Sequence, residues 1–484
     1  MRKFVLFACL LSWVWGTSPF ESASPSGPYS VDPDPLETMG MSRTDPLNEL
    51  LDETLAARFL DEFWEQKHVH VKRDMEEYFS RLIPIAALDA ILDSSCHIDH
   101  KIFLEEESGM EFGPDGDFNL VKRVTKEDGE VWTASPNIEA SLFDKTSRSE
   151  FAHEAFSKGF SLVINRMNYR WPMIYQICEL LARKALGFRL NVNLYFTPAN
   201  SQGFEAHFDW MEAFVLQIEG SKHWKLREFS NHSIRLPFAE QKFKPANDQL
   251  GSVVEELRMN PGDVLYIPSG MIHEAETIST KTSSVHLTIG MEIDLPFTWI
   301  GVILRVLHQI DFQSSIINGI PEKELVSGAA LYIGATVTHN WRFRRAVPFG
   351  FWFNASDTES RSLVLEELNA KLEATANVVE RNQWSLADLS STIQRFQTRI
   401  APYFPTWLSN MESLSTVQET ISLSPQILRN AINNVETLTH ALDEMSGELF
   451  RHVQAHNSRT RRYVNRNNDR LKKFIEKSRR KDEL

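Results

Sequence analysis

Apolar residues recur at helical spacing where the globular part of the chain begins. If a helix is drawn from Leu47 onward, large apolar residues share one stripe on its surface. These residues are Leu51, Leu55, Phe59 and Phe63. The segment "HVHVKR" then alternates like a strand, and a second helical pattern runs from Tyr78 to Leu92. The pattern predicts N-terminal helices that pack through their apolar stripes, with a strand between them.

The middle of the chain changes to short alternating runs. After a helix predicted from Trp171 to Leu186, the residues up to about 295 form short strands separated by Gly, Pro and Asn. This arrangement is typical of an antiparallel barrel or sandwich. Within it, "EAFVLQIE" and "KHWKL" flank Gly220-Ser221, which predicts a hairpin with a type II′ turn.

The C-terminal part returns to helical spacing. The region from Thr358 to Arg480 is rich in helix formers. A further apolar stripe consists of Leu428, Ile432, Val435 and Leu438. The chain as a whole is predicted to be mixed α+β.

Composition and charge exclude several classes of protein. With 484 residues, 42% hydrophobic and 24% charged, the chain can form two or three domains and is not wholly disordered. A net charge of -14 argues against general nucleic-acid binding. Three cysteines, Cys9, Cys96 and Cys178, exclude a four-cysteine zinc site and allow at most one disulfide, from Cys96 to Cys178.

The two ends of the chain carry addressing signals. Two basic residues precede an apolar run from Phe4 to Trp15, which is about half of the ~20 residues that a membrane-spanning helix needs. Residues 1–24 are therefore predicted to be a cleaved signal peptide, and no transmembrane segment is expected. Residues 25–45, rich in Pro and Ser, are predicted to be a disordered linker. The last four residues match an endoplasmic reticulum (ER) retrieval signal: Lys481, Asp482, Glu483 and Leu484.

These signals predict a protein of the ER lumen that binds the retrieval receptor through its last four residues. The basic segment before them, "RTRRYVNRNNDRLKKFIEKSRR", is interpreted as a solvated helix that presents the signal. An acidic lumenal partner, the anionic membrane surface and docking on the protein's own body remain alternatives.

Three residues of the strand-rich region have the types and spacing of a metal site. His207 and Asp209 are two residues apart, so in an extended segment their side chains point to one side. A third ligand is required, and His273, which follows Pro268 and Gly270, can supply it. Two histidines and one carboxylate form the facial triad of non-haem Fe(II) oxygenases. His-x-Asp alone is mostly structural, so the hypothesis depends on the combination.

Lys222 is predicted to lie on the same side of its strand as Trp224 and Leu226. Burial of an unpaired ammonium costs several kcal/mol, so a lysine among inward apolar residues needs an anionic partner. The alternative is that the side chain extends to the rim of the sheet.

The segments "NLYFTPANSQGFEAHFDWMEAFVLQIEGSKHWKL", "MNPGDVLYIPSGMIHEAE" and "SSVHLTIG" together resemble the Jumonji-C (JmjC) ribosomal-oxygenase family. These are cupin-type Fe(II)/2-oxoglutarate protein hydroxylases. The upstream "FLDEFWEQKHVHVKR" and the downstream "RFRRAVPFGF" are also similar to the family. The resemblance covers about residues 55 to 350.

The resemblance implies a domain organisation. Residues 46–300 would form the JmjC catalytic domain, a double-stranded β-helix of the jelly-roll or cupin type with N-terminal helices. Residues 301–410 would form a helical dimerisation region, so a homodimer is expected. Residues 411–480 are expected to form a helical C-terminal region with the basic tail, and residues 481–484 are the retrieval signal.

The resemblance also implies roles for individual residues. His207, Asp209 and His273 would hold iron, and Lys222 would pair with the distal carboxylate of 2-oxoglutarate. Asn193 and Tyr195 match positions of the cosubstrate pocket, and they lie two apart on "VNLYFT", so both can face the interior. The alternative for Tyr195 is a core aromatic of a strand. These matches imply Fe(II), 2-oxoglutarate and O2 as the reactants besides the substrate.

Two positions depart from the family pattern. The family commonly follows His-x-Asp with a second acidic residue, whereas this chain has Trp210. Near the end of "HLTIG" the family tends to carry a hydroxyl residue close to the cosubstrate, whereas this chain has Gly290. Thr288, two residues earlier on the same face, is expected to supply the hydroxyl instead.

The resemblance implies hydroxylation of a protein side chain, with histidine or arginine as the expected target, in the ER lumen. One alternative is a catalytically silent cupin that binds a protein client. Another is lysine demethylation, which is less expected because histone tails are absent from that compartment.

Overall fold

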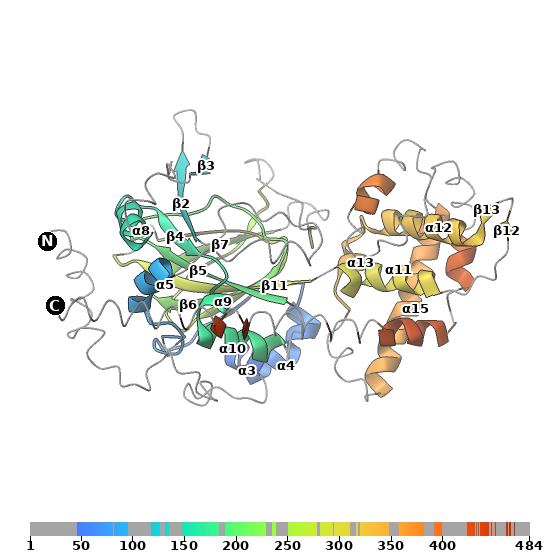
Figure 1. Cartoon of the computed structure of the whole chain (residues 1–484), viewed down its shortest axis with the longest axis horizontal. Coiled ribbons are helices and arrows are strands. Elements are labelled where there is room, and N and C mark those ends of the chain that lie inside the picture. The colour runs from blue at the N-terminus through green and yellow to red at the C-terminus, as the bar shows by residue number, and fades with distance from the viewer. Residues whose placement is uncertain are drawn as a thin grey trace, which may run out of the picture.

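The fold was analysed in a computed structural model. The described residues are 46–80, 82–94, 118–125, 131–134, 148–182, 189–228, 235–238, 250–277, 281–293, 295–309, 316–317, 320–347, 358–381 and 392–398, and parts of 424–469. A strand-rich part and a helical part lie side by side (Figure 1).

The strand-rich part contains two antiparallel sheets. The larger sheet has the order β1-β9-β6-β11-β5-β4-β2-β3, and the smaller has the order β10-β7-β8. The strands are β1 (Val69–Val71), β2 (Phe118–Thr125), β3 (Val131–Ala134), β4 (Ser161–Ile164), β5 (Arg189–Thr197), β6 (Glu212–Glu219), β7 (Lys222–Arg227), β8 (Val253–Met259), β9 (Val264–Ile267), β10 (Ile272–Glu276) and β11 (Ser284–Glu292).

From β5 onward the chain passes back and forth between the sheets. β5 and β6 belong to the larger sheet and β7 and β8 to the smaller one, and β9, β10 and β11 then alternate between the two. This is the winding of a double-stranded β-helix, a jelly-roll built from two facing sheets. The predicted mixed α+β fold with a jelly-roll core is confirmed.

The predicted hairpin at Gly220-Ser221 is wrong. β6 pairs with β9 and β11, whereas β7 pairs with β8 and β10. The turn therefore carries the chain from one sheet to the other. Gly220 has a φ of 59°, and a Cβ there would lie 1.9 Å from the carbonyl oxygen of Ser283, so the position requires glycine. Turn chemistry specifies a reversal of the chain, but it does not specify which strands pair.

An inner core fills the space between the sheets. It consists of Val215, Trp224, Leu226, Leu257, Met259, Leu265, Ile267 and Met271. Along β7 the buried residues alternate with half-buried ones, and Lys222 is on the buried side with Trp224 and Leu226. This confirms the prediction that Lys222 lies on the same face of the strand as Trp224 and Leu226.

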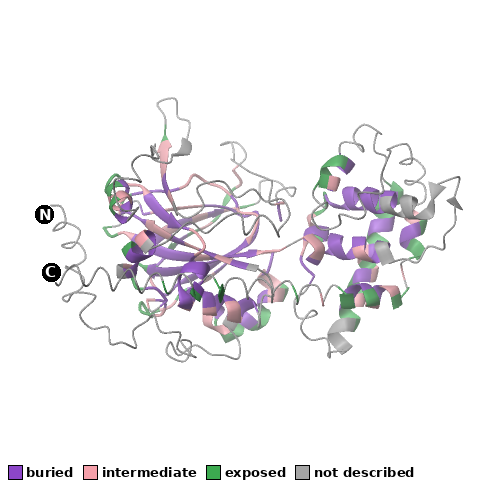
Figure 2. Cartoon of the chain, viewed as in Figure 1, coloured by how far each residue is buried: buried purple, intermediate pink, exposed green. Residues whose placement is uncertain are grey.

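Helices cover the outer face of the larger sheet, which explains why β6 is buried on both faces (Figure 2). Phe59 packs on the rings of Phe214 and Tyr266, with centroid distances of 5.4 and 4.8 Å. Full burial of a large apolar side chain is worth about 1.5–3 kcal/mol. These contacts fix the N-terminal segment to the sheet that carries the inner core.

The N-terminal stripe packs against the core as predicted, with Leu51 and Phe59 buried and Leu55 and Phe63 half-buried, but the helix is divided. α3 (Pro46–Leu51) ends before Asp52, which has a φ of 76° and whose carboxylate accepts a hydrogen bond from the Leu55 N–H at the start of α4 (Glu53–Arg58). A π-helical turn, Phe59–Phe63, follows. An aspartate immediately before a helix is a strong N-cap, so Asp52 favours the start of a new helix at this point.

The helix predicted from Tyr78 to Leu92 is wrong in its first half. Pro84 is extended, with φ -71° and ψ 123°, and helix begins only with the 3-10 turn Ile85–Ala87 and α5 (Leu88–Ser94). Proline lacks an N–H and disfavours helix in the residue before it, which explains the late start.

Three further helices pack beside the sheets. They are α8 (Arg148–Ser157), α9 (Met167–Arg170) and α10 (Pro172–Leu181). α10 confirms the predicted helix as far as the structure describes it and begins with proline, which suits the first helical position. Cys178 in this helix is a buried free thiol.

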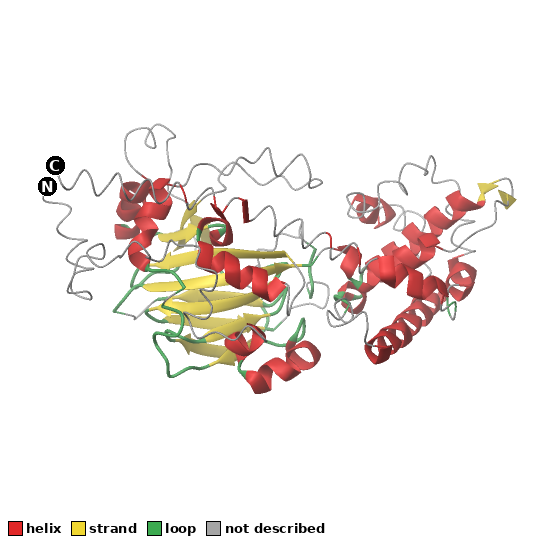
Figure 3. Cartoon of the chain, turned by 60° about the horizontal axis from the view of Figure 1, so that its bottom comes forward, coloured by secondary structure: helices red, strands yellow, loops and turns green. Residues whose placement is uncertain are grey.

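The helical part follows the last jelly-roll strand (Figure 3). It contains a 3-10 turn (Leu295–Phe297), α11 (Trp299–Gln309), β12 (Ile316–Ile317), β13 (Ile320–Pro321), α12 (Glu322–Val337), α13 (Trp341–Arg344) and α15 (Thr358–Arg381). Leu428 and Leu438 of the predicted stripe are buried and Ile432 packs against the same core, whereas Val435 lies outside the described residues. The helical character is confirmed, and dimerisation stays a prediction. None of the helices in the described ranges combines the length and apolarity that a membrane crossing requires.

The predicted signal peptide, linker and retrieval signal lie outside the described residues. Near the start of the basic tail, Arg461 donates to the Tyr175 hydroxyl at 3.2 Å and pairs with the Glu179 carboxylate at 2.6 Å. Both partners belong to α10. At this point the tail contacts the protein's own body. The alternative of docking through the apolar residues Leu471, Phe474 and Ile475 stays a prediction, since these residues lie outside the described ones.

Two buried carboxylates join three parts of the chain. Glu65, which follows the N-terminal helices, accepts the N–H of Ala346 at 2.8 Å and pairs with Arg345 at 3.1 Å, both from the helical part. Its own N–H donates to the Tyr266 hydroxyl, which in turn donates to Glu212 at the start of β6. Burial raises the pKa of Glu65 to about 7 and that of Glu212 to about 8.

Candidate active site

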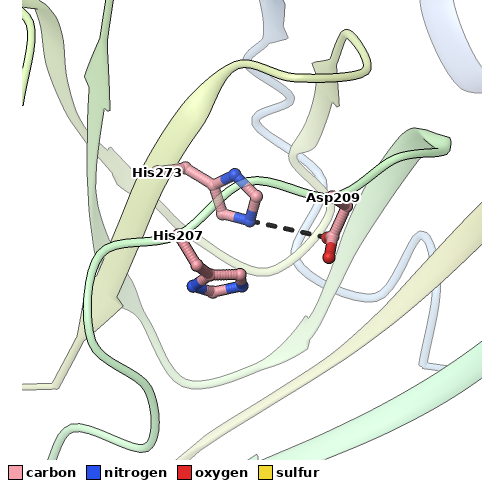
Figure 4. Close-up of side chains that lie close together, drawn as sticks. All are labelled: His207, Asp209 and His273. Carbon is pink, nitrogen blue, oxygen red and sulfur yellow. Dashed lines mark ion pairs between the residues drawn. The ribbon is translucent and has the colours of Figure 1, made fainter. Parts of the chain in front are cut away.

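The side chains of the three predicted metal ligands lie close together (Figure 4). His207 and Asp209 precede β6, and His273 lies in β10. His207 and His273 are directly paired, because each backbone N–H donates to the carbonyl of the other, at 3.1 and 2.8 Å. The Gly270 N–H donates to the Asp209 carbonyl at 2.8 Å. One candidate ligand atom from each of the three side chains lies within 4.8 Å of the other two.

Backbone carbonyls orient both imidazole rings. Nδ1 of His207 lies 2.7 Å from the Glu205 carbonyl oxygen, and Nδ1 of His273 lies 2.9 Å from that of Met271. A carbonyl can only accept, so each Nδ1 carries the proton and each Nε2 keeps its lone pair. Nε2 of His273 is 3.7 Å from Oδ2 of Asp209. The arrangement presents two imidazole nitrogens and a carboxylate oxygen to a common point.

Burial differs across this group of ligands. Burial and the neighbouring His207 lower the pKa of His273 to about 4, so its imidazole is neutral at neutral pH, which is the form that binds a metal. The side chain of His273 is 9% exposed, whereas that of Asp209 is 42% exposed. The site is therefore closed behind His273 and open beside Asp209, where small reactants can enter.

The donor set fits a divalent first-row metal. Mixed imidazole and carboxylate ligands suit iron and its neighbours, and three protein ligands leave coordination positions for reactants. Hydrogen bonds from ligand imidazoles to backbone carbonyls are the usual supports of such sites. Among the residues that the structure describes, one group of potential metal ligands lies close enough together to share an ion, and it consists of these three residues.

Lys222 is a buried cation within the inner core. Its side chain is 5% exposed, and Nζ donates to the Thr197 hydroxyl at 2.9 Å. No carboxylate among the described residues forms an ion pair with it. Burial lowers the pKa of Lys222 to about 7. The alternative of an exposed lysine at the rim is wrong, and the requirement for an anionic partner remains.

Asn193, Tyr195 and Thr288 share the inner face of the larger sheet. Asn193 on β5 is directly opposite Thr288 on β11, and Tyr195 is opposite His286. Burial and the nearby Asp209 carboxylate raise the pKa of Tyr195, so the phenol stays protonated and can donate a hydrogen bond. The predicted side chains therefore line the space between the sheets, next to the metal ligands.

His286 and Thr197 also belong to this face, although the sequence analysis does not single them out. The His286 ring stacks on Tyr195, with centroids 4.7 Å apart and planes at 3°, and it meets the edge of Trp224 at 5.6 Å. The two-residue period of a strand could have identified both residues. Thr197 follows Tyr195 by two positions, and His286 precedes Thr288 by two.

The two departures from the family pattern lie near the start of β6, because Trp210 follows Asp209 and Gly290 is paired with Ala213. The carbonyl of Trp210 accepts a hydrogen bond from the Ser269 hydroxyl at 2.9 Å, which fixes the backbone beside Asp209. Gly290 is one inward-facing position beyond Thr288 on β11 and offers no hydroxyl. Thr288 lies on the expected face, and its predicted role as a substitute stays a prediction.

Residues 164–295 match the family model of the JmjC domain. This segment is similar to JmjC domains. The matched segment extends from the end of β4 to the 3-10 turn after β11, and it includes every residue predicted above for the iron and cosubstrate sites.

The chain is similar to two curated proteins, one named as an oxygenase and the other as a demethylase and hydroxylase. Ribosomal oxygenase 2 of Mus musculus is 28% identical over 239 residues, which cover 48% of this chain and 44% of that protein. The bifunctional lysine-specific demethylase and histidyl-hydroxylase NO66 of Drosophila mojavensis is 28% identical over 246 residues, which cover 51% of this chain and 24% of that protein. The chain thus spans less than half the length of these relatives.

Among solved structures, the chain is similar to the ribosomal oxygenase YcfD of Escherichia coli in complex with cobalt and 2-oxoglutarate. The two share 15% sequence identity, the match covers 81% of this chain and 70% of that chain, and the TM-score is 0.33. At this TM-score, nothing further is inferred from the match.

Proposed function

We propose that this chain is an Fe(II)- and 2-oxoglutarate-dependent dioxygenase that hydroxylates a protein side chain. The observation that carries the proposal is the pairing of two features in one inner space. His207, Asp209 and His273 present a metal-binding donor set, and the buried ammonium of Lys222 has no carboxylate partner among the described residues. The JmjC domain and the oxygenase relatives support the same function.

Fe(II) held by the three ligands supplies the redox chemistry through which O2 is activated and 2-oxoglutarate is oxidised to succinate and carbon dioxide. Lys222 binds the distal carboxylate of 2-oxoglutarate, and this ion pair offsets the cost of burying both charges. Thr197 orients the ammonium, since its hydroxyl accepts from Nζ. Trp224 and the other residues of the inner core exclude water from this pocket.

We propose histidine or arginine as the hydroxylated residue, because the name of one relative describes a histidyl-hydroxylase and the chain resembles hydroxylases of both residues. Lysine demethylation, which the same name carries, remains the second candidate. We further propose a homodimer formed through the helical region that follows the jelly-roll. Nucleic acid is not an expected partner, given the net charge of -14.

We propose the ER lumen as the site of action. The apolar run from Phe4 to Trp15 and the terminal Lys481, Asp482, Glu483 and Leu484 support this location. The test is imaging of the full chain and of a chain without its last four residues. Secretion of the shortened chain and lumenal retention of the full one are expected, and equal cytosolic staining of both would contradict the proposal.

Succinate formation by the purified protein tests the proposed activity. The protein is incubated with Fe(II), 2-oxoglutarate and extracts of lumenal proteins, beside the His207→Ala and Lys222→Met variants. Succinate from the wild type, and at least about a hundredfold less from His207→Ala, is the expected result, since loss of a ligand removes most of the metal-dependent rate. Equal succinate from wild type and variant, or none from either, would support a silent client-binding cupin instead.

A further inference from the structure

Gly290 has no backbone reason to be glycine. It lies within β11, paired with Asn191 on one side and Ala213 on the other. It is not among the glycines with positive φ. Glycine inside a strand weakens it and, where the conformation is ordinary, often marks the close approach of another group. The reason for glycine must therefore lie in the side chain that packs over this position.

The side chain of Met211 occupies the space that a larger residue at position 290 would need. A Cβ at position 290 would lie 2.3 Å from Sδ of Met211 and 3.5 Å from its Cγ. A Cβ does not approach another atom at 2.3 Å, so any other residue at 290 would displace the thioether. Glycine and methionine are thus matched to each other across the end of the sheet.

This pair borders the candidate active site. Met211 follows the ligand Asp209 by two residues and is half-buried, so part of its side chain faces solvent. Gly290 is on the face of β11 that also carries Thr288 and His286. The thioether therefore covers the inner face of β11 at Gly290, on the segment that carries Asp209, and we call this surface the wall.

The wall is apolar and polarisable. A thioether is only a weak hydrogen-bond acceptor, and glycine offers no side-chain donor or acceptor. An imidazole inserted against this wall would leave a ring nitrogen without a partner, which costs binding free energy. A substrate side chain that presents methylene groups would lose no hydrogen bond there and would gain van der Waals contacts with sulfur and carbon.

We propose that Met211 and Gly290 act as a matched specificity pair that selects a side chain presenting methylene groups at the mouth of the site. The inference rests on the proposed function and narrows it: arginine, through its aliphatic stem, is favoured over histidine as the hydroxylated residue. Both residues are positioning elements of the pocket and neither takes part in the reaction.

The first experiment measures specificity. Wild-type protein, Fe(II) and 2-oxoglutarate are incubated with a peptide library that is random except for one central residue, and oxygen incorporation at that residue is read by mass spectrometry. The expected wild-type preference for arginine-centred over histidine-centred peptides is about tenfold or more, the discrimination that small changes in a pocket achieve. The combined variant Gly290→Ser/Met211→Ala, which supplies a hydroxyl and removes the thioether, is expected to reduce this preference. Met211→Leu, which keeps an apolar wall, is expected to retain it.

Histidine-centred peptides modified as well as arginine-centred ones, or a preference that the combined variant leaves unchanged, would overturn the proposal. Oxidation of 2-oxoglutarate without modification of any central residue would also overturn it. If the wild type neither binds 2-oxoglutarate in calorimetry with Mn(II) nor forms succinate, the proposed function itself fails.

The second experiment tests the pairing without any need for activity. Melting temperatures are measured for Gly290→Ala, Met211→Ala and the double variant. Gly290→Ala should lower the melting temperature of the wild type, because the new Cβ displaces the thioether, but should lower it much less when Met211 is already alanine. Strictly additive shifts would show that the two positions are independent and would overturn the matched pair.

Discussion

Burial lowers the pKa values of both Lys222 and His273, but the two side chains suit partners of opposite charge, an anion for Lys222 and a metal cation for His273. Burial lowers the pKa of His273 to about 4, which keeps the imidazole neutral for a metal. Burial lowers the pKa of Lys222 to about 7, and the ammonium has the Thr197 hydroxyl as its hydrogen-bond partner. An anion in the pocket would restore the charged form of the lysine, so binding of a dicarboxylate is linked to protonation.

The first prediction is a pH dependence of 2-oxoglutarate binding. Above about pH 7 the empty pocket holds neutral Lys222, and binding must take up a proton to form the ion pair. The affinity should therefore fall by up to about tenfold per pH unit above pH 7 and level off below it. Calorimetric titrations with Mn(II)-loaded protein in two buffers of different ionisation enthalpy check this result. A proton uptake of zero at pH 8, or an unchanged affinity in Lys222→Met, would contradict it.

The second prediction concerns Tyr195. The phenol stays protonated in the inner space beside Asp209, so it is available as a donor to a bound carboxylate. Tyr195→Phe should weaken 2-oxoglutarate binding by about 1 kcal/mol, or roughly fivefold, the usual net value of one hydrogen bond. Tyr175→Phe, on α10 and against Arg461, is the matched control and should leave the affinity unchanged. Equal effects of the two variants would assign Tyr195 the role of a core aromatic.

At the scale of elements, the connection between β6 and β7 decides whether Lys222 reaches the pocket. The turn at Gly220 takes the chain from the larger sheet to the smaller one, and Lys222 is the first residue of β7. Its ammonium thereby faces Thr197 at the end of β5, on the opposite sheet. A true hairpin would have placed both strands in one sheet.

The third prediction follows from this turn. Gly220→Ala places a Cβ 1.9 Å from a backbone oxygen and also forces an alanine to a φ of 59°. The free energy of unfolding should fall by at least about 2 kcal/mol, since strain at a left-handed residue and a backbone clash add. Gly159→Ala is the control, because its φ is also positive but its nearest neighbour is the flexible end of Lys122. Denaturant melts check the difference, and equal losses would show that the backbone contact is unimportant.

Much of this architecture could be predicted from the sequence. The two-residue period places Lys222 beside Trp224 and puts Asn193 and Tyr195 on one face, because side-chain direction in a strand follows from position alone. The triad could be predicted because His-x-Asp and a distal histidine together match the donor set of a non-haem iron site.

The remaining features depend on contacts between distant parts of the chain. The sheet to which β7 belongs is set by its pairing with β8 and β10, and local turn chemistry does not contain that information. The role of Gly290 likewise depends on the side chain of Met211, which precedes a neighbouring strand. The errors in helix boundaries have local causes, namely Pro84 and the N-cap Asp52, whose effects the apolar spacing alone does not reveal.

At the scale of the whole molecule, Glu65, Glu212 and Arg345 connect the N-terminal helices, the larger sheet and the helical part. Both carboxylates are almost fully buried, and their pKa values are raised to about 7 and 8. In the unfolded chain they would titrate near 4.5. Between about pH 4.5 and pH 7, these two carboxyl groups are therefore protonated in the native state and ionised in the unfolded state.

The fourth prediction is the resulting pH dependence of stability. A raised native pKa contributes stability that is complete below about pH 4.5 and is lost as the pH rises through 7 to 8. Glutamine stays neutral at every pH, so the free energy of unfolding of the wild type should fall relative to that of Glu212→Gln between pH 5 and pH 8.

Comparison with a variant is needed because buried groups with lowered pKa values, His273 and Lys222, contribute with the opposite sign over parts of the same range. Their contributions cancel in the difference between wild type and Glu212→Gln. Denaturant melts at several pH values measure this difference. Glu76→Gln, at an exposed position, is the control and should show a constant difference. A constant difference for Glu212→Gln as well would contradict the assignment.

The most direct test of the central claim is the fate of the two oxygen atoms of O2. Wild-type protein, Fe(II), 2-oxoglutarate and the peptide library are incubated under dioxygen labelled with oxygen-18, and both products are examined by mass spectrometry. A dioxygenase of the proposed type places one labelled atom in succinate and one in the modified peptide, and Asp209→Ala places a label in neither. Unlabelled products, or labelled products that persist in Asp209→Ala, would contradict the assignment of the triad and of the reaction.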